Sequence, residues 1–200
     1  MKPIQTLPAD FYLAWSLELK HNTRLNIILQ LIGLVWMALA GWLLSLCLLW
    51  MRPELADALQ GNFTGSTMLI GLLILLVLMI AVIILHELVH GLFFLIFTGK
   101  RPEFGLGPGY AFAAMPDWFF PKGRYLVIGL SPLLGLTAMG LAACVFAPLP
   151  WLGVILAGMI INAGGAIGDM YICGRIAREG REVFIKDSGD GFQLYRRQSG

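Results

Sequence analysis

The stretch MLIGLLILLVLMIAVIILHELVHGLFFLIF, residues 68–97, decides how this chain folds. It is long enough to cross a lipid bilayer, because the apolar core needs about 20 residues of helix. Its only ionisable side chains are those of His86, Glu87 and His90. Such groups are costly inside a membrane, and those that occur there usually face the interior of a helix bundle and mark a function. The stretch therefore predicts a membrane-spanning helix that carries a functional site.

The rest of the chain also has the composition of a membrane protein. Of its 200 residues, 58% are hydrophobic and 13% are charged, and the mean hydropathy is +0.78. Three further apolar runs are long enough to span a bilayer, at residues 25–50, 125–146 and 151–173. We therefore predict an all-α integral membrane protein with about four transmembrane helices. A net charge of only +2 gives no indication of a nucleic-acid partner.

The basic residues predict how the chain is oriented in the membrane. All of the 14 lysines and arginines except Arg52 lie on one side of the four expected spans. Cytoplasmic loops of membrane proteins carry an excess of Lys and Arg. We therefore expect both termini, and the loop between the second and third spans, in the cytoplasm. The expected organisation is a cytoplasmic or interfacial segment 1–24, a transmembrane core 25–174 and a cytoplasmic tail 175–200.

Three segments outside the spans have recognisable patterns. Residues 8–20 mix aromatic, apolar and charged side chains after a proline, which favours a helix lying in the membrane interface. Residues 104–112 are rich in glycine and aromatics around GPG, which predicts a hairpin near the membrane surface. In the tail, two short strand-like runs, 183–185 and 192–195, flank the turn sequence DSGDG. We expect them to form a small cytoplasmic hairpin.

The sequence HELVH, residues 86–90, has the spacing of a zinc-hydrolase site. His86 and His90 are four residues apart, so on a helix their side chains share one face and can bind the same ion. Glu87 lies beside them, where it can act as the general base for a water on that ion. Neutral imidazoles suit Zn²⁺. The alternative is that the two histidines hydrogen-bond each other or a backbone carbonyl.

A catalytic zinc site keeps three protein ligands and a water, so a third ligand is required. Asp169 is the best candidate, because it is the only other acidic, basic or histidine residue in the expected spans and lies at nearly the same depth as His90. Alternatively, Asp169 pairs with Arg175 or Arg178 at the end of the helix. His21 is a weaker candidate, since it lies in a polar stretch before the first span.

Two further residues in the spans have open roles. Asn162 either hydrogen-bonds a substrate carbonyl or oxyanion, or forms an ordinary bond between helices. Pro132, in GLSPLLG, is expected to kink the third span and to free a backbone carbonyl.

These motifs resemble those of known membrane peptidases. HExxH in a transmembrane helix, followed two spans later by an Asn-containing, glycine-rich segment that ends in Asp, is similar to the site-2-protease type of intramembrane zinc metalloprotease. The elements HELVHG, SPLLG, NAGGAIGD and KDSGDGFQLY look still more like the small prokaryotic family of zincin membrane peptidases. Gly165 and Met170 depart from the site-2 pattern, which has proline and glycine near these positions. The resemblance implies a prokaryotic cell membrane.

The expected function is an intramembrane zinc metalloprotease that acts on membrane-protein or transmembrane-peptide substrates. In this interpretation His86, His90 and Asp169 hold Zn²⁺, and Glu87 is the catalytic base. Two alternatives stay open: a zinc-dependent hydrolase of a lipid or another membrane amide, and a non-proteolytic zinc-binding scaffold or sensor. Four helices enclose such a site thinly, so a homodimer is also plausible.

Overall fold

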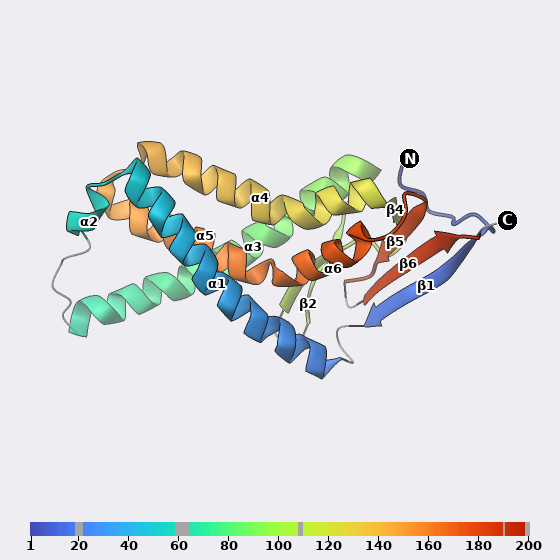
Figure 1. Cartoon of the computed structure of the whole chain (residues 1–200), viewed down its shortest axis with the longest axis horizontal. Coiled ribbons are helices and arrows are strands. Elements are labelled where there is room, and N and C mark those ends of the chain that lie inside the picture. Colours follow the sequence, from blue (N-terminus) through green and yellow to red (C-terminus); the bar gives the residue numbers. More distant parts are fainter. Residues whose placement is uncertain (19–21, 59–64, 108–109, 190, 199–200) are drawn as a thin grey trace.

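The fold combines a bundle of long apolar helices with a β-sheet at one end (Figure 1). We describe it from a computed structural model that covers residues 1–18, 22–58, 65–107, 110–189 and 191–198. The helices are listed here in chain order: α1 (Thr23–Met51), α2 (Leu55–Ala58), α3 (Gly65–Thr98), α4 (Lys122–Phe146), α5 (Leu149–Gly165) and α6 (Ile167–Ala177). His21 lies outside the described residues.

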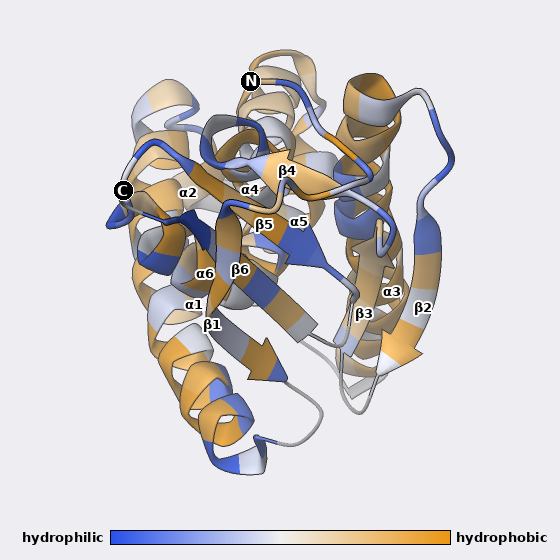
Figure 2. Cartoon of the chain, turned by 90° about the vertical axis from the view of Figure 1, so that its right-hand side faces the viewer, coloured by the Kyte–Doolittle hydropathy of each residue, from blue (hydrophilic) through white to orange (hydrophobic). Residues whose placement is uncertain are grey.

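Three helices are long and apolar enough to cross a membrane, namely α1, α3 and α4. They confirm the first three predicted spans. Many outward side chains on α3 are large and apolar, such as Leu72 and Val77, which are 63% and 67% exposed. Lipid tolerates such a surface and water does not, so the chain is a membrane protein. Figure 2 shows these hydrophobic helices behind the more mixed surface of the sheet.

The predicted fourth span is broken. It consists of α5 and α6, which are bent by 47° at Ala166. If α5 and α6 together form one span, the described residues contain four spans, and otherwise they contain three. The backbone N–H of Ala166 still donates to the carbonyl of Asn162 at 3.1 Å, as in a regular helix, and α6 then begins in a new direction. The bend decides where the side chain of Asp169 lies.

The prediction of a mainly helical protein is confirmed, but the fold is not all-α, because the described residues also form two β-sheets. The larger is antiparallel, in the order β1-β6-β5-β4. Its strands are β1 (Phe11–Glu18), β4 (Phe119–Pro121), β5 (Val183–Asp187) and β6 (Gly191–Arg197). It joins both ends of the chain, which lie at the same end of the molecule (Figure 1).

The interfacial helix predicted for residues 8–20 was also wrong. Residues 11–18 form the edge strand β1, which pairs with β6 from Phe11 opposite Arg197 to Glu18 opposite Gly191. Aromatic side chains favour strands as readily as interfacial helices. The partner strand lies some 180 residues away in the sequence, as the pairing of Phe11 with Arg197 shows. No local pattern could reveal that partner.

Both predicted hairpins are present. After α3, β2 (Glu103–Gly107) pairs with β3 (Tyr110–Ala114) as a separate two-stranded sheet. At the C-terminus, β5 pairs with β6, as expected, but this hairpin forms the centre of the larger sheet instead of standing alone. That sheet packs on the ends of α3, α4 and α6 through a buried cluster that includes Phe94, Phe120, Ile128, Ile176 and Ile185. The sheet therefore lies next to the polar residues of the spans.

Candidate metal centre

Helix α3 holds His86 and His90 on one face, directed into the bundle. Each residue is 7% exposed, and the centres of the two rings are 5.0 Å apart. The residues around them on α3 are almost entirely aliphatic or aromatic. A helix places residues four apart on the same face, so this part of the site was set by the sequence alone.

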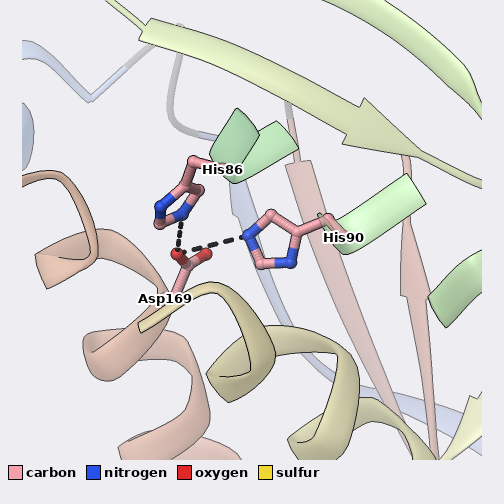
Figure 3. Close-up of side chains that lie close together, drawn as sticks. All are labelled: His86, His90 and Asp169. Atoms are coloured by element: carbon pink, nitrogen blue, oxygen red, sulfur yellow. Dashed lines mark hydrogen bonds and ion pairs between the residues drawn. The ribbon is translucent and has the colours of Figure 1, made fainter. Parts of the chain in front are cut away.

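Asp169 completes the cluster from the first turn of α6 (Figure 3). One of its carboxylate oxygens, Oδ2, lies 2.9 Å from Nε2 of His86 and 3.3 Å from Nε2 of His90. The start of a helix favours a negative charge, because the N–H groups of the first turn point toward it. The alternative partners are excluded within the described residues, since Arg175 bonds to Glu179 and no ion pair joins Asp169 to Arg178.

The second nitrogen of His90 bonds to a carbonyl that proline has released. Nδ1 of His90 lies 2.9 Å from the carbonyl oxygen of Ile128 on α4. In a regular helix that oxygen would accept from the N–H of residue 132, but residue 132 is proline and has no N–H. Pro132 therefore leaves the Ile128 carbonyl without its backbone donor, and this oxygen accepts from His90 as well as from the hydroxyl of Ser131, at 2.8 Å.

Asn162 plays the equivalent part for His86. Its side-chain oxygen lies 3.0 Å from Nδ1 of His86, and its amide nitrogen donates to the carbonyl oxygen of Pro132 at 3.2 Å. It is only 2% exposed. Of the two roles left open for Asn162, the structure shows the bond between helices. Metal-binding histidines usually have such a partner on the second nitrogen.

These hydrogen bonds determine which nitrogens carry protons. The carbonyl of Ile128 and the side-chain oxygen of Asn162 can only accept, so both histidines carry a proton on Nδ1. In a neutral imidazole, Nε2 then offers a lone pair. Two such lone pairs point at a carboxylate oxygen that also only accepts. Acceptors that converge in this way repel each other unless a cation, or a second proton on one of the imidazoles, lies between them.

The three groups fit a zinc ion. Their ligand atoms all lie within 4.8 Å of one another. Ligands about 2.0–2.1 Å from a tetrahedral ion are separated by about 3.3 Å, close to the separations of 2.9 and 3.3 Å found here. Two imidazole nitrogens and one carboxylate oxygen form a typical donor set for a catalytic zinc that keeps a position open for water.

A cavity of about 380 Å³ surrounds the centre, and Glu87 lines it together with the three candidate ligands. A second, apolar cavity of about 340 Å³ between α3 and the β2–β3 hairpin also reaches Glu87. Glu87 therefore lies where the two cavities adjoin, and it is the only ionisable residue that lines both. The hairpin, predicted from its glycines and aromatics, forms part of the wall of each cavity through Ala111 and Phe112.

A comparison with known families agrees with this centre. The model of a family described as "Putative zincin peptidase" matches residues 79–184, more than half of the chain. The chain belongs to this family. The matched part contains all five residues of the site predicted from the sequence, which are His86, Glu87, His90, Asn162 and Asp169. No curated protein and no solved structure matches the chain.

Membership of the zincin peptidase family implies zinc and peptidase chemistry, without distinguishing the site-2-protease type. The sequence alone did not reveal two features of the cavity. One is the use of the Ile128 carbonyl, which could have been found by counting four residues back from Pro132. The other is Asp187, which enters the cavity from the C-terminal sheet. No local signal distinguished Asp187 from an ordinary turn residue.

Proposed function

We propose that this chain is an intramembrane zinc metalloprotease that cleaves peptide bonds of membrane-embedded substrates. One observation carries the proposal: three acceptor atoms, from His86, His90 and Asp169, converge inside a bundle of apolar helices, beside a glutamate that lines the same cavity. Polar groups are kept at such depth mainly for function. The zincin family supports the same chemistry.

In this proposal, different residues would bind the metal, orient its ligands and transfer the proton. His86, His90 and Asp169 would hold the zinc, with Asn162 and the Ile128 carbonyl fixing the two imidazole rings. When bound, zinc lowers the pKa of a coordinated water and polarises a carbonyl. Glu87 would take the proton from the attacking water and transfer it to the leaving amine.

The β2–β3 hairpin offers a way to hold an unwound substrate. A transmembrane helix satisfies its own backbone bonds and must unwind before its peptide bonds can be attacked. Within the described residues, β3 has a strand partner only on its β2 side. Ala113 in β3 and Glu87 line the same cavity. A substrate strand added to this edge would run past Glu87.

The basic residues support a cytoplasmic position for the sheet and both termini. The resemblance to the zincin membrane peptidases implies that the membrane is a prokaryotic cell membrane. Water would then reach the cavity from the cytoplasmic side. A homodimer would enclose the site more fully, and we keep it as a proposal that crosslinking in native membranes can test.

The decisive experiment combines metal analysis with turnover in detergent-purified protein. We expect about one zinc per chain in the wild type and in Glu87→Gln, and loss of zinc in His86→Ala and Asp169→Ala. Glu87→Gln should retain the metal but abolish cleavage, so an uncleaved membrane protein should accumulate in cells that carry it. A wild type without zinc after purification free of chelators would contradict the proposal.

The remaining outcomes identify the alternatives. If Glu87→Gln changes no phenotype although zinc is bound, the protein is a scaffold or sensor. If the wild type turns over lipid extracts and no peptide, it is a hydrolase of a lipid or another membrane amide. Replacing residues 104–112 with a Gly/Ser linker tests the hairpin separately, because intact cleavage in that variant would rule out strand addition.

A further inference from the structure

Asp187 is a buried carboxylate in the cavity that the proposed chemistry does not use. It ends β5, is 6% exposed and lines the same cavity as Glu87 and Asp169. Its oxygen Oδ2 accepts from the hydroxyl of Tyr125 at 2.6 Å, and Oδ1 accepts from the N–H of Gly189 at 2.9 Å. It lies just beyond the residues that the family model matches, so family membership assigns it no role.

The charge of Asp187 has no partner within the described part of the chain. None of the ion pairs found there involves Asp187, and no lysine or arginine lines the cavity. Burial raises the pKa of Asp187 to about 6, although the bonds from Tyr125 and Gly189 act in the opposite direction. A buried carboxylate without a cation is unfavourable, so its retention calls for a reason.

The charges that line the cavity also indicate that Asp187 lacks a compensating cation. Its lining carries three carboxylates, from Glu87, Asp169 and Asp187. A zinc ion held by neutral histidines would balance two negative charges, those of Asp169 and Glu87. The charge of Asp187 remains unbalanced. Asp187 lines the cavity, where a bound substrate can reach it.

The surroundings of Asp187 match a cationic side chain. The rings of Phe112, Tyr125 and Phe192 line the same cavity. Gly189 has a positive φ of 80°, and a Cβ there would come within 2.3 Å of the Phe112 ring, so the turn after Asp187 packs directly on this aromatic wall. A carboxylate beside aromatic faces is the usual environment for the ammonium of lysine or the guanidinium of arginine.

We propose that Asp187 is a specificity-determining residue that binds a lysine or arginine side chain flanking the cleaved bond of the substrate. This inference rests on the proposed peptidase function and names its substrate class: apolar membrane segments with a basic residue at one end. Such segments are common, because lysine and arginine gather at the cytoplasmic ends of transmembrane helices. The sheet that carries Asp187 lies at the end of the apolar bundle, where such a residue would be found (Figure 1).

A purely structural role for Asp187 would need only its hydrogen bonds. Asp187→Asn separates the two roles, because an amide oxygen can accept from Gly189 and the amide N–H can donate to the Tyr125 oxygen. This variant removes the charge and retains both contacts. Tyr125→Phe does the opposite, since it retains the carboxylate and removes one contact. Asp117→Asn is the matched control, because Asp117 is exposed and does not line the cavity.

The test compares apolar peptides that differ at one position. Each carries either lysine or glutamine, moved stepwise through both flanks of the apolar segment. Binding is measured in zinc-loaded Glu87→Gln protein, with and without Asp187→Asn, and cleavage is measured in the wild type. At one position we expect lysine to bind about tenfold more tightly than glutamine, and the ratio to fall to about one in Asp187→Asn. Tyr125→Phe and Asp117→Asn should retain the preference, with zinc content unchanged.

Each outcome is decisive. Equal binding of lysine and glutamine peptides at every position, or a preference that survives Asp187→Asn, would overturn the inference. If the wild type cleaves both peptides equally well, the protease proposal stands and this inference falls. If lysine peptides bind selectively through Asp187 but are never cleaved, the cation site stands and the protease proposal falls.

Discussion

Nδ1 of His90 on α3 lies 2.9 Å from the carbonyl oxygen of Ile128 on α4, the oxygen that Pro132 leaves without its helical partner. A proline in the third span thus orients a candidate metal ligand in the second. The same segment of α4 also accepts from Asn162, through the carbonyl of Pro132, and Asn162 in turn holds His86. Both imidazole rings are therefore positioned by one irregular turn of α4.

Pro132→Ala should change stability and zinc affinity in opposite directions. Alanine restores an N–H that competes for the Ile128 carbonyl, so we expect the zinc dissociation constant to rise by up to about tenfold. A proline inside a helix costs about 3 kcal/mol, so the variant should also melt at a higher temperature. Competition with a zinc chelator and thermal unfolding measure the two effects. Pro150→Ala, at the start of α5, should leave zinc affinity unchanged.

Substitutions of Asn162 should distinguish a positioning role from contact with the oxyanion. Asn162→Leu removes the acceptor for His86, so zinc affinity should fall by about 10- to 100-fold. Asn162→Asp retains an acceptor and should remain within a few-fold of the wild type. Zinc titration of both variants gives the comparison. Normal zinc affinity with lost turnover in Asn162→Leu would instead place Asn162 on the substrate.

Gly165 lines the cavity at the end of α5, and a Cβ added there would meet no atom within 4 Å. A side chain at this position therefore fits the fold but enters the space for substrate. We expect Gly165→Leu to retain zinc and stability while peptide cleavage falls by about tenfold or more. Gly135→Leu is the matched control, because Gly135 has equally open surroundings on α4 and does not line the cavity. Equal activity of both variants would contradict a substrate path over Gly165.

Glu179 should make the attachment of the sheet to α6 sensitive to acid. It bonds to Arg196 of β6 and to Arg175 of α6, and these bonds, with Arg196 contributing most, hold its pKa below the usual 4.5. The folded state therefore binds fewer protons than the unfolded state, so the stabilisation is complete above about pH 4.5 and is lost as the pH falls below that value. Glu179→Gln should lack this dependence.

At neutral pH we expect Glu179→Gln to lower the melting temperature by a few degrees, and the gap from the wild type to close in acid. Thermal unfolding in detergent at several pH values measures this, and hydrogen exchange in β6 locates it. Glu182→Gln is the control, since the side chain of Glu182 is 62% exposed and, among the described residues, forms an ion pair only with Arg197. A constant gap from pH 7 to pH 3 would exclude an electrostatic origin.

The parts of the fold that depend on local patterns were predictable. The apolar runs located α1, α3 and α4, because membrane length is a property of consecutive residues. Glycines between aromatic residues located the β2–β3 hairpin. The strand β1 was not predictable, because its residues become a strand only by pairing with β6 at the opposite end of the chain. The bend at Ala166 was not predictable either, because the sequence there looks like a continuous apolar span.

The candidate site likewise has one part that the sequence predicted and another that only the tertiary structure revealed. The sequence by itself determined that His86, Glu87 and His90 share one helix in an apolar span, because four residues make about one helical turn. It also indicated the depth of Asp169. Only the tertiary structure decided that Asp169 meets both histidines, that Ile128 and Asn162 orient them, and that Asp187 enters the cavity. Those contacts join α3, α4, α5, α6 and β5, and side chains on separate elements meet only after the whole bundle and sheet have packed.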